Sequence, residues 1–128
     1  MARIRQAELS LDQAVGQLFT DREKSVESLD KAARTFENLA DRKDLNSDLR
    51  ERVLAGVARV LECRCDGTDK TVKPAIEAWE KLLKEYPDSK KFNDIAESRV
   101  KALKSENSKA FYAWFQTQNP KASDDLLL

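Results

Sequence analysis

The fold of this chain is indicated most clearly by the stretch from Thr71 to Ser89, TVKPAIEAWEKLLKEYPDS. Thr71 can cap the start of a helix, Pro74 falls in its first turn, where a missing N–H costs little, and Pro87 ends it. Between them, apolar residues recur at the spacing of one helical face. They are Ala75, Ile76, Ala78, Trp79, Leu82, Leu83 and Tyr86. The stretch therefore predicts one strongly amphipathic helix with defined ends.

Helical spacing continues on both sides of this stretch, and no window alternates as a β-strand does. One helix is expected at about residues 48–62, after an N-cap at Asn46 or Ser47, and its wide apolar stripe implies neighbours on two sides. Asp66-Gly67 marks the turn that follows it. Another helix is expected at about residues 89–103. Its inward residues are Phe92, Ile95, Ala96, Val100 and Leu103.

Two apolar clusters precede residue 41. The first contains Leu11, Val15, Leu18 and Phe19, and the second contains Val26, Leu29, Ala33, Phe36 and Ala40. Between them, TDRE (Thr20 to Glu23) has the spacing of a capping box, so that a new helix can begin there. A single long helix through both clusters fits the pattern equally well. The sequence leaves open whether Leu11 to Ala40 is one helix or two.

Composition limits the classes of partner. The 128 residues favour one domain, and 23 basic residues balance 23 acidic ones, so we expect no nucleic-acid partner. No run approaches the roughly 20 apolar residues of a membrane span, and no direct membrane insertion is expected. The expected location is cytoplasmic. It becomes membrane-associated or periplasmic if the natural protein has an upstream anchor.

The sequence offers little for catalysis. It contains no histidine, and its three glycines are isolated, so neither the usual proton-transfer side chain nor a phosphate-binding loop is present. We therefore predict that the chain is not an enzyme and uses no cofactor or metal. Cys63 and Cys65 are interpreted as ordinary reduced cysteines at a helix end. A redox role for them stays open.

A spacing of small residue, aromatic residue and leucine occurs twice. Ala32, Phe36 and Leu39 form one copy, and Ala75, Trp79 and Leu82 form the other, 43 residues later. Pro87 follows Ala75 by twelve positions, whereas Asp44 stands at the equivalent place in the first copy. This pattern resembles the second helix of a tetratricopeptide repeat (TPR).

The resemblance implies an all-α fold of five or six helices, arranged as antiparallel hairpins stacked into a short TPR-like solenoid. It implies a single domain over residues 1–120, with a repeat-like core at 26–103, a capping helix at 108–118 and a flexible tail at 121–128. The segment AWEKLLKEYPDS together with FYAWF also resembles the C-terminal part of bacterial TPR-like proteins that end in FYxWF. Many of those proteins carry an upstream membrane anchor and resemble the translocon-associated tetratricopeptide subunit.

The same resemblance implies a non-catalytic scaffold or adaptor that binds a protein or peptide on a concave face. The groove-facing positions would be Arg52, Ala55, Arg59 and Glu62 on one helix and Asn93 and Glu97 on the next. Arg52 and Arg59 either hold an acidic side chain of a partner or pair with carboxylates of the helix surface. Family members that clamp a peptide C-terminus have Lys and Asn at the positions of Ala55 and Arg59. This chain therefore does not match the residues of that clamp.

An alternative function is self-assembly, because a short solenoid leaves apolar ends that can join copies of the chain into a homo-oligomer or filament. The segment KAFYAWFQTQNP (Lys109 to Pro120) bears on this choice. Phe111, Trp114 and Phe115 share one helical face, whereas Tyr112 points elsewhere. The segment is either a cap over the apolar end left by Ile95, Val100 and Leu103 or an exposed docking patch. In a cap, Trp114 would be buried core.

Overall fold

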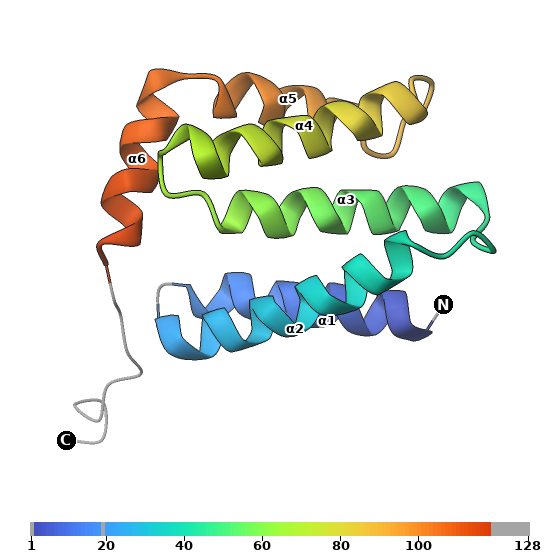
Figure 1. Cartoon of the computed structure of the whole chain (residues 1–128), viewed down its shortest axis with the longest axis horizontal. Coiled ribbons are helices and arrows are strands. Elements are labelled where there is room, and N and C mark those ends of the chain that lie inside the picture. Colours follow the sequence, from blue (N-terminus) through green and yellow to red (C-terminus); the bar gives the residue numbers. More distant parts are fainter. Residues whose placement is uncertain (1, 19, 119–128) are drawn as a thin grey trace.

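The computed structural model describes residues 2–18 and 20–118, and six α-helices lie within them (Figure 1). They are α1 (Ala2–Gln17), α2 (Arg22–Ala40), α3 (Ser47–Cys63), α4 (Asp69–Glu85), α5 (Asn93–Leu103) and α6 (Glu106–Gln116). The prediction of an all-α chain is confirmed for these residues. Phe19 and the predicted tail at 121–128 lie outside the described part of the chain.

From α1 to α5, consecutive helices pack against each other in an antiparallel manner. α1 packs on α2, α3 contacts both, α4 packs on α3, and α5 packs on α4. In Figure 1, α1 and α5 lie behind α2 and α4, and α3 lies between the two pairs. α6 runs across the ends of the other helices instead of along one of them (Figure 1). α6 therefore does not cover the sides of α1, α3 and α5 along their length.

The core consists of two clusters that share α3. One cluster joins α1, α2 and α3 around Phe36, and the other joins α3, α4 and α5 around Trp79. Val53 and Val60 of α3 belong to the first cluster, whereas Leu54 and Ala58 belong to the second. The prediction that this helix has neighbours on two sides is therefore confirmed. Phe36 and Trp79, the aromatic residues of the two spacing motifs, are both almost fully buried.

The segment from Leu11 to Ala40 forms two helices. Asp21, and not Thr20, caps α2, because its side chain accepts a hydrogen bond from the Lys24 backbone N–H at 3.2 Å. The buried Ser25 hydroxyl then donates to the Ala14 carbonyl at 2.7 Å and ties α2 to α1. The predicted cap at Asn46 is confirmed, since its side chain accepts from the Leu49 N–H at 2.9 Å.

Three helix starts differ from the predictions. α4 begins at Asp69, and Thr71 does not cap it, because the Thr71 hydroxyl donates to Asp66 instead. α5 begins at Asn93 and not near residue 89. The Ser89 hydroxyl donates to Glu51, and this hydrogen bond holds the residues before α5 in a turn. α6 covers Glu106–Gln116 instead of 108–118, because Ser105 accepts a hydrogen bond from the Ser108 N–H and caps the helix earlier.

Some residues expected to point inward are exposed. Val15, Val26 and Ile95 keep large exposed fractions, because the neighbouring helices do not cover these positions. Glu51 shows the opposite behaviour, since it is a buried carboxylate that accepts the Ser89 hydroxyl. None of the helices described between residues 2 and 118 combines the length and apolar character that a bilayer span requires.

Candidate functional site

α1, α3 and α5 share a face on which arginines and carboxylates pair between helices. Arg52 and Arg59 of α3 both pair with α1, and Glu62 of α3 pairs with α5. The pairs are Arg52 with Glu8, Arg59 Nη2 with Asp12 Oδ1 at 3.1 Å, and Arg99 Nε with Glu62 Oε1 at 2.6 Å. Three of the sequence-predicted groove residues therefore lie on this shared face, each beside a carboxylate or guanidinium of a neighbouring helix.

The two pairs with α1 differ in exposure. Arg52 bonds Glu8 through both Nε and Nη2, and its side chain is only 19% exposed. Arg59 bonds Asp12 through Nη2, and its side chain is 40% exposed. An exposed pair of this kind stabilises a protein by only about 0.2–1 kcal/mol. Arg52 is therefore part of the packing between α1 and α3, whereas Arg59 remains accessible from solvent.

Two apolar hollows meet at Arg59 and Glu62, which line both of them. The first has a volume of about 330 Å³, and its apolar lining consists of Val15, Leu18, Cys63, Phe111, Tyr112 and Phe115. The second has a volume of about 300 Å³, and its apolar lining consists of Ala55, Trp79, Phe92 and Ile95. The sequence placed the groove and the aromatic segment in separate sites, and the fold brings them together.

The remaining predicted groove residues lie elsewhere. Asn93 begins α5 and donates its side-chain N–H to the Pro87 carbonyl at 2.6 Å, so it closes the loop before its own helix. Glu97 is exposed on α5. Neither residue lines the two hollows, and neither does Arg52.

α6 is attached to helix ends that are far apart in the sequence. Arg22, at the start of α2, donates to the Gln116 side chain at 3.2 Å and to the Phe115 carbonyl at 3.1 Å, and its guanidinium lies 4.3 Å from the centre of the Phe115 ring. Gln116 donates in turn to the Cys65 carbonyl at 2.7 Å. On α5, Arg99 donates to the Tyr112 hydroxyl at 3.3 Å. These contacts hold α6 where Phe111, Tyr112 and Phe115 line the first hollow.

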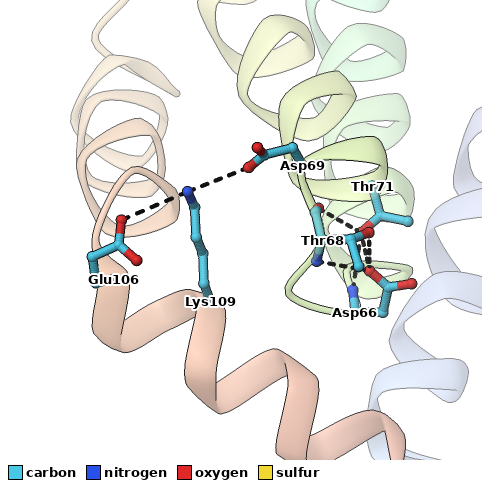
Figure 2. Close-up of polar contacts among 6 residues, drawn as sticks. All are labelled: Asp66, Thr68, Asp69, Thr71, Glu106 and Lys109. Atoms are coloured by element: carbon cyan, nitrogen blue, oxygen red, sulfur yellow. Dashed lines mark hydrogen bonds and ion pairs between the residues drawn. The ribbon is translucent and has the colours of Figure 1, made fainter.

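The turn between α3 and α4 contacts α6. The Asp66 carboxylate accepts hydrogen bonds from the Thr68 N–H and from the Thr68 and Thr71 hydroxyls, which lowers the pKa of Asp66 to about 2 (Figure 2). Gly67 follows with a φ of 86°, and an added Cβ there would lie 2.4 Å from the Lys109 carbonyl oxygen. Lys109 also extends between Asp69 and Glu106 (Figure 2). Only glycine permits this approach of α6.

The four aromatic side chains of α6 are not buried alike. Phe115 is 7% exposed and Tyr112 packs against the cluster around Trp79, whereas Phe111 and Trp114 are 50% and 57% exposed. The ring centres of Phe111 and Phe115 are 5.7 Å apart in a stacked arrangement. Tyr112 lies on another side of α6 than Trp114, and because α6 crosses the helix ends, this side faces the cluster around Trp79. Trp114 is correspondingly not buried core.

Near this site, Cys63 is half-buried and Cys65 is buried. Cys63 lines the first hollow, and Cys65 donates its thiol to the Leu61 and Thr71 carbonyls. Burial raises the pKa of Cys63 to about 11 and that of Cys65 to about 12, so both thiols are protonated at neutral pH. Among the residues described here, no group of three or more His, Cys, Asp or Glu side chains is arranged to hold a metal ion.

Several residues of the site were missed from the sequence. Asp12 and Val15 belong to α1 and Leu18 follows it directly, so all three precede the repeat-like core expected at 26–103, and Arg99 was not among the predicted groove positions. The helical spacing of Val15 and Leu18 with Leu11 was the available signal, but it indicated burial and not a hollow. No protein-family model, curated protein or solved structure matches the chain. The geometry of the site is therefore the basis for a functional proposal.

Proposed function

We propose that the chain is a non-catalytic scaffold or adaptor that binds a segment of a partner protein on the face shared by α1, α3 and α5. The pair of apolar hollows that meet at Arg59 and Glu62 carries this proposal. Tight protein contacts are usually made by a few bulky side chains that fill such pockets, surrounded by polar groups. Val15, Ile95 and Phe111 are exposed apolar side chains at the hollows, and burying them under a partner would contribute most to the binding free energy.

We further propose that the hairpins form a short TPR-like solenoid. Ala32 with Phe36 and Ala75 with Trp79 are buried at equivalent places in α2 and α4, which supports two repeats of one hairpin unit. In that arrangement α1, α3 and α5 are the first helices of successive repeats. First helices line the concave face of such a solenoid, and the two hollows lie on them.

Affinity purification with matched variants tests the proposed face. Val15→Glu and Ile95→Ser alter one hollow each, and both positions are exposed enough to tolerate a polar side chain. Val26→Glu and Leu9→Ser are the controls, since they change similarly exposed apolar residues that line neither hollow. A partner identified by mass spectrometry should bind the two site variants at least about tenfold more weakly than the wild type, and the controls unchanged. Equal binding by all four variants would exclude this face.

Self-assembly is the second candidate function. Phe111 and Trp114 are each half or more exposed on α6, and their ring centres lie 6.2 Å apart, so they form a small aromatic surface. Exposed aromatic residues of this kind are enriched at contacts between proteins. The oligomeric state of the chain decides between this candidate and a monomeric adaptor.

A further inference from the structure

We propose that the partner segment carries an aspartate or glutamate between two bulky apolar side chains, and that its carboxylate binds Arg59. This inference rests on the proposed function, because it assigns a chemical class to the segment that fills the two hollows. The apolar side chains enter the hollows on either side, and the acidic group lies where the hollows meet.

The charges that line the hollows favour an acidic partner. Arg59 and Arg99 are the cations, and Glu62 is the anion. Glu62 accepts a hydrogen bond from Arg99 Nε at 2.6 Å, and Arg99 also donates to the Tyr112 hydroxyl. These two charges therefore neutralise each other within the lining. Arg59 remains as the positive charge at the junction.

Arg59 has the capacity to bind another carboxylate. A guanidinium has five N–H donors, and within the described residues Arg59 uses Nη2 alone, toward Asp12. Asp12 is itself well exposed, so its pairing with Arg59 is weak and exchangeable. Burying an acidic side chain beside Arg59 strengthens the new ion pair, because the surrounding apolar walls exclude water.

The spacing of the hollows sets the length of the segment. Along α3, Ala55 lines the second hollow, Cys63 lines the first, and Arg59 lies midway between them. At a rise of about 1.5 Å per residue, Ala55 and Cys63 are roughly 12 Å apart along the helix. An extended segment covers that distance with about four residues, which leaves room for one acidic residue between the two apolar ones.

A random peptide library displayed on phage, selected on the whole chain, tests this inference. Selected peptides should carry an Asp or Glu between two bulky apolar residues. A fluorescein-labelled synthetic copy of the best peptide should bind Arg59→Gln at least about tenfold more weakly in fluorescence anisotropy. Asp12→Asn should bind it about two- to fivefold more tightly, because that change removes the competing carboxylate.

Arg64→Gln and Asp30→Asn are the matched controls. Arg64 Nη2 and Asp30 Oδ1 form a pair at 3.0 Å whose exposure resembles that of Arg59 and Asp12, and neither residue lines a hollow. Both control variants should bind the peptide as the wild type does. A gain of affinity in Asp30→Asn equal to that in Asp12→Asn would reflect net charge alone and would overturn the assignment of Arg59.

Four further outcomes would also overturn it, and they separate the inference from the proposed function. Peptides that lack an acidic residue and bind Arg59→Gln normally, yet lose binding to Val15→Glu or Ile95→Ser, would refute the acidic partner and leave the face in place. Peptides indifferent to Val15→Glu and Ile95→Ser would refute both proposals. Tighter peptide binding to a chain that ends at residue 118 would mean that residues 119–128 occupy the hollows. Tighter peptide binding when the protein is diluted would mean that a second copy occupies them.

Discussion

At the scale of single residues, a missing Cβ decides how closely α2 and α3 approach. An added Cβ at Gly56 would lie 2.3 Å from Cε1 of the buried Phe36 ring, so the ring occupies the space that any other residue would fill. Gly16 in α1 has nothing within 4 Å of such an atom. Both glycines lie within α-helices, and they differ in what surrounds them.

Alanine substitutions at these glycines should have opposite effects. Gly56→Ala should lower the free energy of unfolding by about 1–3 kcal/mol, because the Phe36 ring must move in a closely packed core. Gly16→Ala should raise it by about 0.5–1 kcal/mol, because alanine has the higher helix propensity. Urea unfolding followed by circular dichroism measures both. A stabilising Gly56→Ala would show that the two helices are farther apart than described.

The Asp66 turn should make stability depend on acid pH. The folded-state pKa of Asp66 is lowered to about 2 by hydrogen bonds from Thr68 and Thr71, whereas an aspartate in an unfolded chain has a pKa of about 3.9. The stabilisation is therefore present above the unfolded pKa and is lost as the pH falls toward about 2. Between about pH 4 and 2, the unfolding free energy of Asp66→Asn should fall less steeply than that of the wild type.

Thr71→Ala is the companion variant for this measurement, because it removes one of the hydroxyl donors to Asp66. It should flatten the same part of the pH profile, and the double variant should add little to Asp66→Asn. Parallel profiles for the wild type and Asp66→Asn would mean that the hydrogen bonds of the turn do not favour the carboxylate.

At the scale of elements, α6 is the helix whose position depends most on polar contacts. Arg22, Gln116 and Tyr112 join it to α2, to the turn after α3 and to α5. Its contact with α5, its predecessor in sequence, is small. Phe115 is its one buried hydrophobic side chain in the described structure. The docking of α6 therefore depends on one anchoring ring and several long-range hydrogen bonds.

Two aromatic truncations in α6 should differ in cost. Phe115→Ala should lower the unfolding free energy by about 3–5 kcal/mol, because it removes a buried ring. Trp114→Ala should change it by at most about 0.5 kcal/mol, because that ring is 57% exposed. Thermal and urea unfolding of both variants measure the difference. The larger cost in Trp114→Ala would instead support the cap in which Trp114 is buried core.

At the scale of the whole molecule, two core clusters are joined through α3, and the apolar residues that remain exposed are spread over α1, α2, α5 and α6. Leu9, Val26 and Trp114, for example, lie on three different helices. A stable contact between two copies needs about 800 Å² from each partner, with a well-packed centre. Scattered residues and the one small aromatic surface of Phe111 and Trp114 do not provide that centre in the described structure.

We therefore expect the chain to be monomeric, with a mass near 14.6 kDa in multi-angle light scattering across a concentration series. A mass that rises with concentration and returns to this value in a Phe111→Ser, Trp114→Ser double variant would favour self-assembly through α6. Leu9→Ser is the control for a general loss of surface apolarity, since it alters an exposed leucine on α1.

Local signals were enough to predict much of the fold. Helical spacing predicted the all-α class and the burial of Phe36 and Trp79, and Pro87 predicted the end of α4. They were less reliable at helix starts, because Asp21 competes with Thr20 for one cap, and because Thr71 bonds Asp66 instead of capping a helix. Such choices depend on which partner a polar side chain reaches in the folded chain.

The sequence alone predicted the main helical segments and the apolar face of each, though not the break between α1 and α2, because helical spacing repeats over one or two turns of the same helix. Only the tertiary structure decided that α6 crosses the helix ends, that Tyr112 and not Trp114 turns inward, and that Arg59 lies between two hollows. These features join α1 to α3 and α6 to Gly67 and Arg22, residues far apart in the chain. Their positions follow from packing all six described helices at once, which the periodicity of a single segment does not specify.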